Sequence, residues 1–177
     1  MAQTKYVNVT GYAEYAKVFP ENRDMPGMTD HPGVNKMLKQ HDGQYSMNFY
    51  PENEEEMKKL FGPLSEKMYG GGDRLKEGNP ELGLGKFISL KRKHKDIKQK
   101  ADGEEIDLGG TPQVVHWDED SKGKQWSYEN DGLIGNGSKV IVKFTVYGEG
   151  ETQSVRLEKV GVIDHVPFEV SEDGERF

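Results

Sequence analysis

The sequence predicts a mainly β protein, a small five-stranded barrel with one α-helix after the second strand and long loops. Three observations indicate this fold class: short runs rich in β-branched and aromatic residues, glycine-containing turns between them, and a single segment with helical periodicity. Short, irregular strands fit a small closed or half-closed barrel better than a parallel sheet. We place this domain at residues 1–163 and a flexible acidic tail at residues 164–177.

The first half of the chain contains two predicted strands and the predicted helix. Residues 6–22 form the first strand, with a β-bulge expected at Gly11. Residues 23–42 are broken by proline and glycine, so we assign them to a loop. Residues 43–56 open with the second strand, and Asn53 then caps a helix. The apolar stripe of that helix consists of Met57, Leu60, Phe61, Leu64 and Met68.

The second half contains the remaining strands. Residues 83–95 and 113–120 are predicted strands, separated by a polar loop. Residues 136–148 alternate cleanly between apolar and polar side chains, as a half-buried strand does. Residues 154–164 change phase by one position near Glu158–Lys159, which predicts a β-bulge there.

Composition excludes several kinds of site. The chain has no cysteine, which removes disulfides, cysteine-based zinc sites and thiol nucleophiles. Its five histidines lack zinc-binding spacing, so we expect no metal and no cofactor. We find no apolar run long enough for a transmembrane helix, and residues 1–20 lack the pattern of a secretory signal. These features predict a soluble, intracellular protein without membrane contact.

Charge is distributed unevenly along the chain. The net charge of −7 argues at first against a nucleic-acid partner. However, residues 86–100 carry seven lysines and arginines against one aspartate, whereas the last fourteen residues carry five acids and one arginine. The sequence therefore has a basic segment and an acidic end.

The basic segment coincides with a predicted strand. Alternation puts Ile88 and Leu90 on one face and Phe87, Lys91 and Lys93 on the other. An exposed ring among cations suits an unpaired nucleic-acid strand, because bases stack on the ring while cations contact phosphates. Alternatively, Phe87 covers the core and the lysines line a strand edge that resists aggregation. This segment alone leaves both interpretations open.

The candidate DNA-binding residues combine this strand with aromatic residues in polar surroundings and two lysines of the cleanly alternating strand. Any one of these aromatic residues, taken alone, is more often part of a core. The set is Lys86, Phe87, Lys91, Arg92, Lys93, Trp117, Trp126, Tyr128, Lys139 and Lys143. We expect binding through it to be tolerant of sequence and sensitive to salt.

Two alternative functions remain at this stage. The consecutive acids Asp118, Glu119 and Asp120 could hold Mg²⁺ in a small nuclease, although acids in a turn are usually only solvated. A structural or assembly protein without a nucleic-acid role would also suit the acidic net charge.

Four segments carry a resemblance to a known family: YVNVTGYAEYAKVF, GQYSMNFYPEN leading into EEEMKKL, LIGNGSKVIVKFTVYG, and the C-terminal FEVSEDGERF. Their order resembles the single-stranded-DNA-binding proteins of short-tailed phages of the autographivirus and cyanophage type, which are OB-fold proteins. The resemblance implies a binding protein rather than an enzyme. It implies a homodimer that coats and protects single-stranded DNA during phage replication and recombination in the host cytoplasm.

The resemblance also implies a role for the tail. In this family an acidic tail ending in an aromatic residue contacts the phage DNA polymerase and primase-helicase. The matching positions here are Glu172, Asp173, Glu175 and Phe177. Gly174 and Arg176 make this tail less densely acidic than the family pattern.

Overall fold

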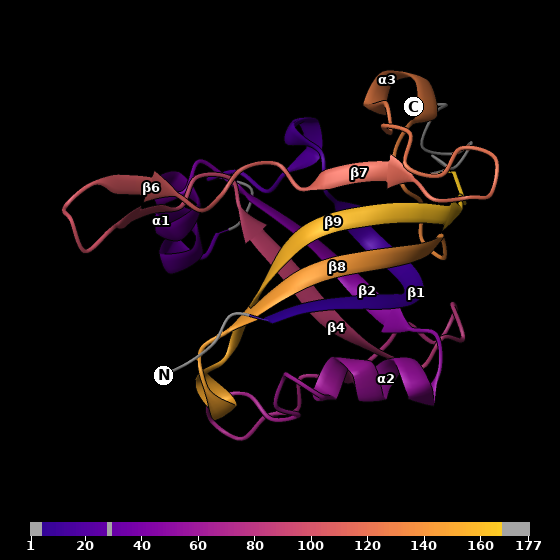
Figure 1. Ribbon diagram of the computed structural model, residues 1–177, viewed down its shortest axis with the longest axis horizontal. Coiled ribbons are helices and arrows are strands. Elements are labelled where there is room, and N and C mark those ends of the chain that lie inside the picture. The colour runs from indigo at the N-terminus through magenta and orange to yellow at the C-terminus, as the bar shows by residue number, and fades with distance from the viewer. Residues whose placement is uncertain (1–4, 28–29, 168–177) are drawn as a thin grey trace.

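The computed structural model describes residues 5–27 and 30–167, and its main feature is one curved β-sheet (Figure 1). The sheet strands are β1 (Lys5–Lys17), β2 (Gln44–Pro51), β3 (Lys76–Glu77), β4 (Lys86–Lys93), β7 (Gln113–His116), β8 (Lys139–Tyr147) and β9 (Ser154–Asp164). Their order is β3-β4-β2-β1-β8-β9-β7, and all neighbours are antiparallel except β7 and β9.

The expected class, mainly β, is confirmed, but the detailed count differs. The sheet has seven strands rather than five, and its hydrogen bonding does not close into a barrel. It curves far enough for β4 to approach β9, so the molecule resembles a barrel with one open seam. Very short strands such as β3 escape sequence analysis because two residues show no periodicity.

Three α-helices are present among the described residues instead of the one expected: α1 (Pro32–Gln40), α2 (Glu54–Phe61) and α3 (Tyr128–Asp131). The loop assignment of residues 23–42 was therefore wrong for α1. Pro32 occupies the first helical turn, where proline is favourable, and His31 Nδ1 accepts a hydrogen bond from the Val34 N–H at 3.2 Å. Leu38 anchors the helix by burial.

The helix α2 begins where the sequence predicts. Asn53 Oδ1 accepts a hydrogen bond from the Glu56 N–H at 3.1 Å, which confirms the cap. The helix ends at Phe61, two residues before Pro63; Gly62 keeps helical dihedral angles, but Pro63 has no N–H with which to continue the hydrogen-bond ladder. Leu64 is still buried, although it lies beyond the helix. In Figure 1, α2 crosses one end of the curved sheet.

The two predicted bulges have different outcomes. In β9, Lys159 pairs with Lys143 and Leu157 with Phe144, so Glu158 is the extra residue and that bulge is confirmed. In β1 the register shifts between Glu14 and Lys17, not at Gly11. Position 11 requires glycine because there is no room for a side chain: a Cβ there would lie 2.1 Å from the Tyr50 carbonyl oxygen.

The remaining segments are smaller. A hairpin of β5 (Ile97–Gln99) and β6 (Glu105–Asp107) projects from the sheet, in a region expected to be loop (Figure 1). The folded part continues beyond the expected boundary at residue 163: the His165 Nε2–H donates to the Leu133 carbonyl at 2.9 Å, and the Val166 N–H donates to Ser138 Oγ at 2.9 Å. Residues Glu172, Asp173, Glu175 and Phe177 lie outside the described part of the chain. Within residues 5–27 and 30–167, no helix is both long and apolar enough to cross a membrane.

Candidate nucleic-acid interface

The outer face of the sheet carries the candidate site. Because side chains alternate along a strand, the burial of Val9, Val142 and Val160 against the core turns their neighbours outward. Cross-strand pairing then places Asn8 of β1, Lys143 of β8 and Lys159 of β9 in one row. The sheet therefore aligns polar and cationic side chains from three strands on one surface.

Aromatic rings lie directly beside these cations. The Lys143 Nζ is 4.9 Å from the Tyr6 ring centroid, and the Arg156 guanidinium is 5.1 Å from that of Tyr147. Two ammonium groups flank Trp117, Lys122 at 5.0 Å and Lys159 at 5.3 Å. We name this set the cation–aromatic face: Tyr6, Trp117, Lys122, Lys143, Tyr147, Arg156 and Lys159.

Among the residues that the structure describes, the cations of this face have no carboxylate partner. None of the ion pairs found there involves Lys122, Lys143, Arg156 or Lys159. By contrast, Lys139 pairs with Glu52 at 3.0 Å, which raises the pKa of its ammonium group, and Lys86 lies 3.8 Å from Glu77. Cations without partners attract polyanions more strongly than paired ones.

The predicted basic strand meets this face at the seam. Lys91, Lys93, Tyr147 and Arg156 line a small cleft of about 60 Å³ between β4 and the β8–β9 pair. The structure thus brings two of the predicted lysines next to a cation and a ring that the sequence analysis did not select.

Arg92 lies at the seam between β4 and β9, so its expected role in phosphate contact is corrected. Its guanidinium donates to the carbonyl oxygens of Gly109, Gly110 and Leu157 at 2.9, 2.7 and 3.2 Å. It also pairs with Glu158 at 2.9 Å, and only 11% of its side chain is exposed. With four of about five guanidinium donors engaged, Arg92 bridges the seam rather than facing a ligand.

Phe87 lies on the outer face of β4, as alternation predicts, with Ile88 and Leu90 buried on the inner face. It is half-buried, and its ring packs 5.6 Å from that of Tyr50. Phe87 is therefore neither fully exposed nor enclosed in the aliphatic core.

The predicted aromatic residues of the 113–130 region divide between surface and core. Trp126 is only 5% exposed, its Nε1–H donates to the Gly132 carbonyl at 2.9 Å, and its ring packs between His116 and His165. Tyr128 packs on Phe19 with ring centroids 5.2 Å apart. Trp126 is therefore corrected from a candidate stacking residue to a packing residue, Tyr128 is half-buried against the core, and Trp117 is the one of the three on the cation–aromatic face.

Several solved structures are similar to this one, among them the following two. The first is gp2.5, a single-stranded DNA binding protein encoded by bacteriophage T7, with a TM-score of 0.55 and 18% sequence identity over 98% of this chain and 94% of that chain. The second is a single-stranded DNA-binding protein from bacteriophage Enc34, with a TM-score of 0.52 and 14% identity over 97% of this chain and 90% of that chain. This chain has the fold of phage single-stranded DNA-binding proteins.

The resemblance inferred from four sequence segments is thus confirmed at the level of the fold. No protein-family model matches the sequence, and no curated protein sequence matches it. At these low identities, the phage single-stranded DNA-binding fold tells us how the backbone is arranged. The binding residues must be argued from this chain's own surface.

The acidic segment after β7 is a structural turn. Asp118 Oδ1 accepts hydrogen bonds from the backbone N–H groups of Asp120 and Ser121, at 3.0 and 2.8 Å. This arrangement caps a turn, a common use of aspartate. Across the described residues, no group of three or more His, Asp or Glu side chains could hold a metal ion. The nuclease hypothesis gains no geometric support.

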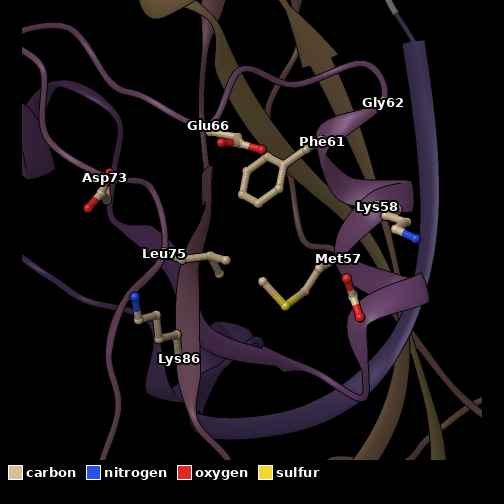
Figure 2. Close-up of a pocket in the computed structure, with 9 residues that line it drawn as sticks. Met57, Lys58, Phe61, Gly62, Glu66, Asp73, Leu75 and Lys86 are labelled. Atoms are coloured by element: carbon tan, nitrogen blue, oxygen red, sulfur yellow. The ribbon is translucent and has the colours of Figure 1, made fainter.

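A roomier cleft of about 610 Å³ lies between α2 and the segment around β3 and β4 (Figure 2). Figure 2 shows Met57, Phe61 and Leu75 pointing into it, with charged side chains around them. Its three acids, Glu54, Glu66 and Asp73, outnumber its two lysines, Lys58 and Lys86. An acid-rich rim suits a polyanion poorly, so we do not place nucleic acid here.

The sequence analysis missed five residues of the cation–aromatic face: Tyr6, Lys122, Tyr147, Arg156 and Lys159. The outward phase of Arg156 and Lys159 was visible, because the bulge at Glu158 separates them and buried apolar residues alternate with them. Their proximity to Lys143 and Trp117 was not visible, because it depends on which strands become neighbours.

Proposed function

We propose that this chain binds single-stranded DNA with little sequence preference, across the outer face of β1, β8 and β9. Phosphates contact Lys122, Lys143, Arg156 and Lys159, while bases stack on Tyr6, Trp117 and Tyr147. The observation that carries the proposal is the contact between accessible rings and cations that have no carboxylate partner among the described residues, all on one sheet face. Every base can stack on an aromatic ring through its π-face, and every phosphate can be contacted by a cation. Binding of this kind therefore does not depend on the DNA sequence.

The extent of the face also supports the proposal. Because Glu158 is bulged, the span from Arg156 to Gly161 on β9 matches four residues of β8, Thr145 to Ile141, which corresponds to about 13 Å at roughly 3.3 Å per residue. Several nucleotides fit along that distance. Lys91 and Lys93 extend the phosphate path across the seam, next to Tyr147 and Arg156.

The finer biological role belongs to the same proposal and is supported by the family resemblance of the sequence. The protein coats and protects single-stranded DNA during phage replication and recombination in the host cytoplasm, as a homodimer. Its acidic tail contacts the phage DNA polymerase and primase-helicase. Co-purification of these enzymes with the full chain, but not with a chain ending at Pro167, is the direct test of the tail.

Reversing charge on the face tests the DNA-binding proposal. We expect Lys143→Glu combined with Lys159→Glu to weaken binding of a fluorescently labelled oligo(dT) by about tenfold or more, because two phosphate contacts become repulsive. Anisotropy titration measures the affinity.

The matched control reverses Lys36 and Lys39, exposed lysines of α1 outside this face, and produces the same change in net charge. If both double variants bind the oligonucleotide equally well, the cation–aromatic face is not the binding surface.

A further inference from the structure

A groove opens on the cation–aromatic face, so this part of the surface is not flat. It has a volume of about 180 Å³ and crosses β8 and β9. Its lining includes Asn8, Trp117, Ile141, Lys143, Lys159 and Gly161. At about 30 Å³ per liquid water, this space corresponds to roughly six water molecules, which is the scale of one planar heteroaromatic ring.

The groove depends on the missing side chain of Gly161. A Cβ at this position would lie 2.9 Å from Ile141 Cγ2 and 2.9 Å from Trp117 Cβ. Gly161 does not have the positive φ that would explain a glycine by backbone conformation. Its role is to leave space, so that the Trp117 ring packs against the strand and walls the groove.

The lining offers distinct chemistry on its different sides. Trp117 and Ile141 supply apolar surface, Lys143 and Lys159 supply positive charge, and Asn8 supplies a side-chain amide with both donors and acceptors. A nucleotide has matching parts: a flat apolar face, a negative phosphate, and a base edge with donors and acceptors.

We infer that this groove takes one nucleobase of the bound strand. The base lies with its face against Trp117 and its edge toward Asn8, and the adjoining phosphate is held by Lys143 and Lys159. The base displaces one ammonium group from the Trp117 ring, and that ammonium turns to the phosphate. This inference rests on the proposed function, and it adds an inserted base and a positioning role for Asn8 and Gly161.

Tryptophan fluorescence tests the location of the base. The chain has two tryptophans, and Trp126 is buried in the core. Titration of the full chain with unlabelled oligo(dT) should quench the emission. Quenching should persist in Trp126→Phe and disappear in Trp117→Phe. Quenching that survives unchanged in Trp117→Phe overturns the inference.

A comparison of normal and abasic strands tests insertion. We expect the unmodified protein to bind a dT 12-mer about tenfold more tightly than an abasic 12-mer of equal charge, in line with the contribution of base–aromatic contacts. Asn8→Ala and Gly161→Ala should each reduce that ratio several-fold while the affinity for the abasic strand stays the same.

Two controls keep this test decisive. Gly62→Ala is a matched substitution at the residue that follows α2, where a Cβ would have ordinary contacts of 3.6 and 3.7 Å, and it should leave the ratio unchanged. Asn8 is exposed, so its variant keeps the test informative if Gly161→Ala does not fold. An unchanged ratio in Asn8→Ala, with oligo(dT) binding intact, refutes the inserted base and leaves the proposed function standing. Absence of binding to either strand would overturn both.

Discussion

Tyr50 is a residue on which three segments converge beneath the outer face. Its hydroxyl donates to Glu14 Oε1 at 2.8 Å and accepts from the Asn79 N–H at 2.9 Å. Burial raises the pKa of the Tyr50 phenol, so it stays protonated as a donor. Glu14 is 3% exposed, and its Oε2 has no hydrogen-bond partner among the described residues. The Glu14 carboxylate therefore depends strongly on the few donors it has.

We predict that Tyr50→Phe lowers the free energy of unfolding by about 1–3 kcal/mol, because one buried donor to Glu14 and one acceptor for Asn79 are lost. Urea denaturation measures the change. Tyr69→Phe is the matched control, because Tyr69 is 84% exposed and should lose nothing. Equal midpoints for the two variants would show that the buried cluster does not contribute.

Asp131 gives the fold a dependence on acid pH. The Ser127 N–H lowers the pKa of this carboxyl by donating at 2.7 Å, and His116 lowers it further through a 3.0 Å contact. A carboxyl with a lower pKa in the folded state stabilises the fold fully above its unfolded pKa. That contribution is lost as pH falls below about 3.8 and through the lower folded-state pKa.

We therefore predict that Asp131→Asn is less stable than the unmodified protein at neutral pH and that the difference shrinks as pH falls through this window. Chemical denaturation at a series of pH values measures it. Asp120→Asn, at an exposed position, should show the same dependence of stability on pH as the unmodified protein. A constant difference between Asp131→Asn and the unmodified protein at all pH values contradicts the assignment.

The β4–β9 seam is the element-scale feature that gives the sheet its barrel-like curvature. The two strands are not neighbours in the hydrogen-bonded order, yet they lie close together. Arg92 bridges them from β4, and Glu158, the bulged residue of β9, also accepts from the Thr145 hydroxyl at 2.8 Å. The bulge therefore turns an acid toward the seam where a regular strand would continue its alternation.

We predict that Arg92→Met lowers the free energy of unfolding by about 3 kcal/mol, because Glu158 and three carbonyl groups lose their partner. Thermal or urea denaturation tests this. Lys91→Met is the matched neighbour, exposed and without an ion pair in the described residues, and should change stability by less than about 0.5 kcal/mol. If Arg92→Met is as stable as Lys91→Met, the seam is held by packing alone.

At the scale of the whole molecule, a net charge of −7 coexists with a locally cationic face. Binding of DNA should therefore be governed by the few cations that contact phosphates, since a charge beyond a Debye length of about 8 Å is largely screened at physiological salt. The acidic total then affects solubility and the rate of encounter more than the contact itself.

We predict that the logarithm of the association constant for oligo(dT) falls with the logarithm of salt concentration with a slope of about −4. Six phosphate contacts, those of the four cations of the face together with Lys91 and Lys93, at roughly 0.7 each for a single strand give this value. Lys143→Ala combined with Lys159→Ala should change the slope to about −3. Titrations at several salt concentrations measure both slopes, and equal slopes would remove these two lysines from the phosphate path.

Local pattern was sufficient for the features that depend on neighbours in the chain. The mainly β class, the inner and outer faces of β4, the Asn53 cap and the bulge at Glu158 all follow from the spacing of side chains along one segment. The helix α1 shows the limit of this reasoning, because its prolines and glycine look like loop residues until Pro32 is seen at a helix start. Arg92 also shares the inward phase of Ile88 and Leu90, although its charge suggests an outward role.

The sequence by itself therefore determined which residues of each strand face outward, because alternation is a local property of extended backbone. Only the tertiary structure decided which outward residues meet. Trp117 lies against Gly161, and Lys159 lies opposite Lys143, because β7 and β8 both pair with β9. Trp126 is buried because its ring fits between His116 and His165. Which side chains come together thus depends on contacts between segments that are distant in the sequence. The free energy of those contacts is set by side-chain packing and strand pairing in three dimensions.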